Sequence, residues 1–116
     1  MNRRHRLSGR RRIAAVREAG SEARSGVIRL RAIEGDGDAS RVAFAVPGAG
    51  GAIRRNRAKR RLRAAIAPLL LEWPRLDLVV SLPGSASEMP FTDLRGALAT
   101  ALGTASTRVS ARKAQS

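Results

Sequence analysis

The stretch Leu76-Asp77-Leu78-Val79-Val80-Ser81-Leu82 decides the fold class, because it is a near-continuous apolar run in a strongly charged chain. Pro83 and Gly84 follow directly and end it. A run of this kind is typical of a central strand whose two faces are both covered. The sequence therefore predicts one sheet with this strand inside it.

Two further strands are predicted upstream of that run. Apolar and basic residues alternate with period two over residues 27–33, and the same period returns over residues 42–46. Residues 35–38 between them read Gly-Asp-Gly-Asp, in which the two aspartates are typical turn formers. The two segments are therefore predicted to pair as an antiparallel hairpin. Residues 21–24 are a candidate for a short additional strand.

Helices are predicted before and after these strands. The first spans about residues 8–19, with Ser8 as its N-cap and Gly20 placed to end it. The last opens at Pro90, carries leucines at three- and four-residue spacing, and is expected to stop at Gly103.

With a third helix described below, the fold class is α+β, a small sandwich with a single sheet. The chain has 116 residues, about the length of one domain. We expect a single α+β domain over residues 1–106 and a disordered basic tail over residues 107–116.

The net charge of +14 is concentrated in two blocks and a tail. Residues 1–17 hold seven arginines and no acid, and residues 54–63 hold seven basic residues in ten. Blocks of this kind indicate a polyanionic partner, a nucleic acid or an anionic membrane surface. A basic run is more often a solvated face, but such a face normally mixes both signs of charge.

The composition leaves few enzymatic chemistries open. The chain has no cysteine, so it can form no thiolate zinc site. Its single histidine, His5, lies in a basic leader and cannot by itself make a Ser-His-Asp triad or a multi-histidine metal site. No apolar run approaches the roughly 20 residues of a membrane span. We expect a cytoplasmic protein with no membrane partner, no metal and no catalytic residues of its own.

The basic block after residue 51 is predicted to be an amphipathic helix. Around Leu62, the residues Ala58, Ala65, Ile66 and Leu69 fall on one helical face and form an apolar stripe. The arginines occupy the remaining arc, where their guanidinium forks suit phosphate groups. A nuclear-localisation-like run or a membrane-surface helix would show a similar pattern, although the apolar face is small and has no aromatic anchor.

The segment Gly51 to Arg63 also resembles the signature of the bacterial ribonuclease P protein component, an Arg-Asn-Arg followed by x-Lys-Arg-x-x-Arg. The matching residues are Arg55, Asn56, Arg57, Lys59, Arg60 and Arg63. The first helix, the strand before the motif and the run 76–80 fall in the order of that family. The resemblance covers about residues 3–103.

This resemblance implies an element order α-β-β-β-α-β-α with a left-handed crossover through the motif helix. It implies a protein subunit that binds the catalytic RNA of ribonuclease P and the 5′ leader of precursor tRNA, a monomer outside the holoenzyme. The RNA and its magnesium ions carry the chemistry, and the protein itself holds no cofactor.

Two groups of site residues follow from the motif and the resemblance. The expected RNA-binding residues are Arg54, Arg55, Asn56, Arg57, Lys59, Arg60, Arg61 and Arg63. The expected residues of a leader cleft between the first helix and the sheet are Ile13, Arg17, Arg31 and Phe44. Family members usually carry aromatic residues where this chain has Ile13, Arg17 and Arg31, so arginine stacking and charge are expected to hold the leader here.

The alternative function is that of a structural ribosomal or nucleoid-type nucleic-acid-binding protein. Such a protein would coat nucleic acid without a processing role, and it would bind the specific RNA and unrelated duplexes with equal affinity at matched salt.

Overall fold

The structure is a computed structural model that describes residues 3–47, 51–72, 75–83 and 88–115. Its α-helices are α1 (Arg10–Ala19), α2 (Ala52–Ile66) and α3 (Phe91–Gln115). Its strands are β1 (Ser21–Ser25), β2 (Ile28–Glu34), β3 (Arg41–Ala45) and β4 (Leu76–Ser81). Short 3-10 turns lie at Arg3–His5 and Leu69–Leu71. The order α-β-β-β-α-β-α and the α+β class are as predicted, and β1 confirms the short additional strand.

The four strands form one sheet in the order β1-β2-β4-β3. β2 pairs antiparallel with both β1 and β4, and β3 pairs parallel with β4. Residues 76–80 of β4 are all buried, which confirms the predicted interior strand. The predicted hairpin between residues 27–33 and 42–46 is wrong, because β4 lies between β2 and β3. In this position β4, the most apolar strand, pairs with a neighbouring strand on each side. If β2 paired with both β1 and β3, β4 would lie at an edge of the sheet.

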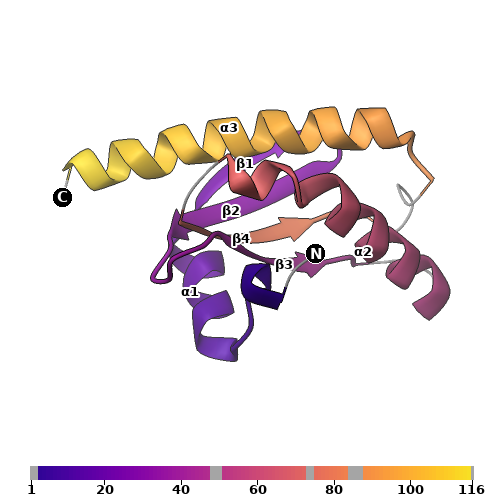
Figure 1. The fold of residues 1–116 in the computed structure, drawn as a ribbon, viewed down its shortest axis with the longest axis horizontal. Coiled ribbons are helices and arrows are strands. Elements are labelled where there is room, and N and C mark those ends of the chain that lie inside the picture. The colour runs from indigo at the N-terminus through magenta and orange to yellow at the C-terminus, as the bar shows by residue number, and fades with distance from the viewer. Residues whose placement is uncertain (1–2, 48–50, 73–74, 84–87, 116) are drawn as a thin grey trace.

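Helices cover both faces of this sheet (Figure 1). α2 and α3 pack on one face, which presents alternate residues such as Leu30, Leu78 and Val80 to the main core. α1 packs on the other face, where Val16 and Leu7 bury Val79. The parallel strands β3 and β4 are joined through α2, as the resemblance implies. The left hand of that crossover stays a prediction.

Helix α1 is shorter at its start than predicted. It begins at Arg10, and Gly9 rather than Ser8 stands at its N-cap with φ 95°, without a side-chain hydrogen bond. Its end at Gly20 is confirmed. A Cβ atom at Gly20 would collide with the carbonyl oxygen of Val16, so glycine allows the chain to turn directly from α1 into β1.

Helix α3 does not stop at Gly103 but continues to Gln115, so residues 107–115 are helical where we expected a disordered tail. Glycine inside a helix costs about 1 kcal/mol relative to alanine. Burial of residues on both sides of it, Leu102 and Ala105 with Val109 packed next to them, outweighs that cost. Lys113 then pairs with Glu34 at 2.9 Å and fixes the last turns over the sheet.

A buried carboxylate ties α1 and β3 to β4. The Asp77 side chain has no exposed surface, and it accepts hydrogen bonds from Arg12 Nε at 2.6 Å and from Arg41 Nε and Nη2 at 3.0 and 2.6 Å. The hydrogen bonds that Arg41 donates to Asp77 raise the pKa of Arg41 above its usual value. Asp36, predicted only as a turn former, also accepts a hydrogen bond from Arg41.

Candidate nucleic-acid interface

Helix α2 divides into a buried apolar stripe and a basic surface. Ala58, Leu62, Ala65 and Ile66 are at most 1% exposed, which confirms the predicted stripe, and Leu69 packs partly buried beside it. Most of the basic residues lie at the surface. The fully exposed motif residues are Arg54, Arg55, Asn56, Arg57 and Arg60. The partly exposed ones are Lys59, Arg61 and Arg63.

Arg55 is the motif residue whose angle around the helix falls closest to the centre of the apolar stripe. The structure leaves it exposed in the first turn of α2, ahead of Ala58, where the buried part of the helix begins. The first turns of α2 therefore extend beyond the core and present all their arginines to solvent.

One edge of α2 makes contacts with the segment that leads into α3. Arg57 Nη1 lies 2.5 Å from Glu88 Oε1. Arg61 donates a hydrogen bond to the carbonyl oxygen of Met89. These contacts hold two arginines at a fixed place on the helix surface. Arg60 lies between them and the opposite edge, and it makes no ion pair with any residue of the described ranges.

The opposite edge of α2 faces β3 and the chain before α1. Lys59 and Arg63 line a hollow of about 180 Å³ together with Arg6 and Phe44. The guanidinium carbon of Arg63 lies 6.0 Å from the centre of the Phe44 ring, within the range of a cation–π contact. Three basic side chains and one aromatic ring therefore line a single hollow at this edge.

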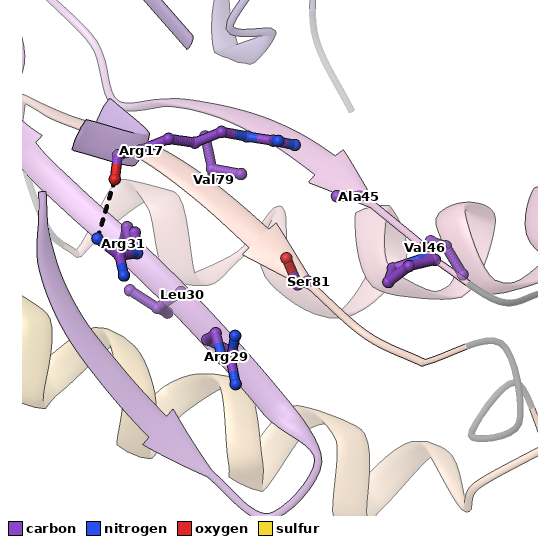
Figure 2. A pocket seen from close by; sticks show the side chains of 9 residues that line it. Arg17, Arg29, Leu30, Arg31, Ala45, Val46, Val79 and Ser81 are labelled. Atoms are coloured by element: carbon purple, nitrogen blue, oxygen red, sulfur yellow. Dashed lines mark hydrogen bonds between the residues drawn. The ribbon is translucent and has the colours of Figure 1, made fainter. Parts of the chain in front are cut away.

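A second hollow of about 560 Å³ lies on the α1 face of the sheet, at the C-terminal end of α1 (Figure 2). Arg17 from α1 and Arg29 and Arg31 from β2 carry its charge, and Ala45, Val79 and Ser81 line it from β3 and β4. Arg31 Nη1 donates to the carbonyl oxygen of Arg17 at 2.9 Å, which caps the end of α1 with a cation. We call this hollow the α1 cleft.

The structure brings together only part of the residues expected in such a cleft. Arg17 and Arg31 line it, but Ile13 is half-buried against Val16 and Val79 beside it. Phe44 lies on the opposite face of the sheet, against α2, because it pairs with Val80, whose side chain points into the main core. The placement of Phe44 in the cleft is therefore wrong, while Ile13 lies between α1 and the sheet next to the cleft.

Sequence reasoning missed Arg29, the third arginine of the α1 cleft. Arg29 and Arg31 are two residues apart on one strand, so their side chains project from the same face. That spacing is visible in the sequence, and it would have placed Arg29 beside Arg31.

Glu22 is the acid associated with these arginines. It lies opposite Arg31 in the β1–β2 pairing. Its carboxylate oxygens are 3.1 Å from Arg24 Nε, 3.3 Å from Arg29 Nε and 4.0 Å from Arg31 Nη2. The hydrogen bond from Arg24, with the charges of all three arginines, holds the pKa of Glu22 below its usual value. Glu22 therefore stays ionised at neutral pH.

Within the described ranges, no group of three or more His, Cys, Asp or Glu side chains is placed to hold a metal ion. None of the helices in those ranges combines the length and apolar content that crossing a membrane requires.

A family model described as Ribonuclease P matches residues 1–106. The chain belongs to the Ribonuclease P family. Three solved structures are similar in fold. The RNase P protein of Staphylococcus aureus is 18% identical, with a TM-score of 0.76 over 87% of this chain and 94% of that chain. The RNase P protein from Thermotoga maritima is 24% identical, with a TM-score of 0.72 over 88% and 96%. Its complex with 1-(4-fluorophenyl)-2-thiourea gives 25% identity and a TM-score of 0.71 over 87% and 97%. No curated protein sequence matches the chain.

Membership of this family makes the chain a ribonuclease P protein subunit that works with the ribonuclease P RNA. The expectation of an RNA-binding protein of tRNA processing is thereby supported.

Proposed function

We propose that the protein binds the catalytic RNA of ribonuclease P through the basic surface of α2. The observation that carries this proposal is the division of α2, whose apolar stripe is fixed in the core while its arginines reach solvent. A helix held in this way keeps its guanidinium groups at constant spacing, which suits contact with successive phosphates. Arg57 and Arg61 are held by residues 88 and 89, which orders them before RNA arrives.

We infer further that the α1 cleft receives the single-stranded 5′ leader of precursor tRNA. Arg17, Arg29 and Arg31 supply positive charge and planar groups on which bases can stack, and Val79 supplies an apolar floor. Stacking on a side chain contributes about 1 to 3 kcal/mol per base when the partner is aromatic. Arginine takes that place in this cleft.

In this proposal the RNA and its magnesium ions carry out the cleavage, and the protein is a cytoplasmic monomer outside the holoenzyme. Most acids described near the two surfaces are already engaged by cations. Asp77 accepts from Arg12 and Arg41, Glu22 from Arg24, and Glu88 pairs with Arg57. Their role is to position arginines rather than to transfer protons.

The direct test is reconstitution with a bacterial ribonuclease P RNA and precursor tRNA at low magnesium. We expect the protein to raise both the cleavage rate and the affinity for precursor over mature tRNA. Shortening the leader to a single nucleotide, which keeps the scissile bond, should abolish the second effect only. No increase in cleavage would contradict the proposal, and equal affinity for the RNA and for unrelated duplex at matched salt would indicate a structural nucleic-acid-binding role.

Arg60→Ala should weaken binding to the catalytic RNA roughly 10- to 100-fold, the size of one lost hydrogen bond to a charged group. The side chain is exposed and lies away from the core, so the melting temperature should not change. The slope of log affinity against log salt concentration should also become shallower by about one, the contribution of one phosphate contact.

Arg95→Ala is the matched control for this variant. It removes the same charge from an exposed position on α3 and should leave RNA affinity nearly unchanged. Equal losses in the two variants would show that total charge, rather than the surface of α2, determines binding.

A further inference from the structure

The outer surface of β1 and β2, next to the α1 cleft, carries an unusual arrangement of charge. Arg24 on β1 lies directly opposite Arg29 on β2, and Glu22 lies opposite Arg31. All four side chains project from the sheet face on which α1 packs. Like charges directly opposite each other on neighbouring strands are destabilising. The Arg24–Arg29 pair therefore needs an anion close to it.

In the protein alone, Glu22 is that anion. One carboxylate oxygen of Glu22 is shared by Arg24 Nε and Arg29 Nε, at 3.1 and 3.3 Å. A single negative charge thus serves three guanidinium groups, including that of Arg31. The Arg24 side chain is 62% exposed and that of Arg29 52%, so the surplus positive charge faces solvent.

This charged surface is continuous with the α1 cleft. Arg29 and Arg31 line the cleft, and Glu22, which contacts both of them and Arg24, links the cleft to Arg24 on β1. A chain of phosphates that leaves the cleft past β2 therefore meets Arg29 first and Arg24 next.

We propose that Arg24 and Arg29 form a phosphate subsite that extends the leader path beyond the α1 cleft, and that Glu22 occupies this subsite until RNA displaces it. The proposal rests on the proposed binding of the leader in the cleft. Phosphate is the better partner, because a nucleic-acid phosphate accepts hydrogen bonds from two guanidinium forks without the constraint of the β1 backbone that holds Glu22. Glu22 then weakens leader binding by competition, and it does so only for leaders long enough to reach β1.

The test measures affinity of the reconstituted holoenzyme for precursor tRNAs whose leaders are lengthened one nucleotide at a time. Glu22→Gln keeps the size of the side chain and removes the competing charge. We expect it to raise affinity for long leaders roughly two- to fivefold, the size of an exposed ion pair. The slope of log affinity against log salt concentration should become steeper by about 0.7, which corresponds to one additional phosphate contact on a single strand. Arg24→Ala should lower affinity for the same leaders by a similar factor. Neither variant should alter affinity for the shortest leaders.

Two variants control for total charge. Glu34→Gln removes the same charge from a residue that pairs with Lys113, and Arg95→Ala removes an arginine from α3. Both should leave the dependence on leader length unchanged. The subsite is refuted if the wild type shows leader-dependent affinity while Glu22→Gln and Arg24→Ala follow their controls, or if Glu22→Gln lowers affinity. If the wild type itself shows no leader-dependent affinity, the leader cleft is refuted and the subsite with it.

Discussion

Asp77→Asn should lower the free energy of unfolding by about 3 to 5 kcal/mol, the usual cost of removing one partner from a buried ion pair. The Asp77 carboxylate has no exposed surface, and it joins α1 through Arg12 and β3 through Arg41. Asparagine fills the same space but places an amide group against two guanidinium donors. Arg12 and Arg41 would then lie close together, with only the exposed carboxylate of Asp36 left to pair with them.

Urea unfolding of the isolated protein measures this loss. Asp38→Asn is the control, because Asp38 is exposed and pairs with no residue of the described ranges, and its effect should stay within about 0.5 kcal/mol. Exposed ion pairs contribute at most about 1 kcal/mol. A loss that small for Asp77→Asn would show that solvent reaches the pair and that α1 is held by its apolar contacts alone.

Leu62→Ala should lower the free energy of unfolding by about 2 to 5 kcal/mol, because it opens a cavity in the core under α2. Leu62 is fully buried at the centre of the stripe that fixes the helix to the sheet. RNA binding should fall only in proportion to the unfolded fraction, since no basic residue is changed. Well below its melting temperature, the variant should therefore bind RNA with an affinity near that of the wild type.

The control for Leu62→Ala is Ile53→Ala on the same helix. Ile53 is 83% exposed, so its truncation should change stability by no more than about 0.5 kcal/mol. Comparable losses at Leu62 and Ile53 would mean that α2 is not held in the core as described. A loss of RNA affinity by folded Leu62→Ala protein would mean that the arginines depend on this contact for their positions.

Local patterns predicted the elements of this fold well, because each pattern acts within a few residues. The period of two located β2 and β3, and the stripe around Leu62 located the buried face of α2. The basic face of α2 followed from that stripe, because a helix with one side buried presents the other to solvent. Gly103 misled the prediction of α3, because contacts with the sheet outweigh the modest cost of one glycine.

Which segments meet across the fold depended on contacts between residues far apart in sequence. Turn chemistry at residues 35–38 favoured a hairpin, but β4 pairs with both β2 and β3 and separates them. The side of the sheet on which Phe44 lies followed from its pairing with Val80, so its separation from Arg17 and Arg31 could not be seen in the sequence. The contacts of Asp77 with Arg12 and Arg41 span 65 and 36 residues and have no local signature.

The sequence by itself determined the apolar run 76–82 that forms β4, the amphipathic basic helix and the absence of cysteine chemistry, because composition and periodicity are properties of the chain alone. Only the tertiary structure decided the strand order, the residues of the α1 cleft and the position of Glu22 among three arginines. These features depend on which strands become neighbours. Strand pairing is selected by burial of β4 on both faces, a free energy that exists only when the whole sheet has formed.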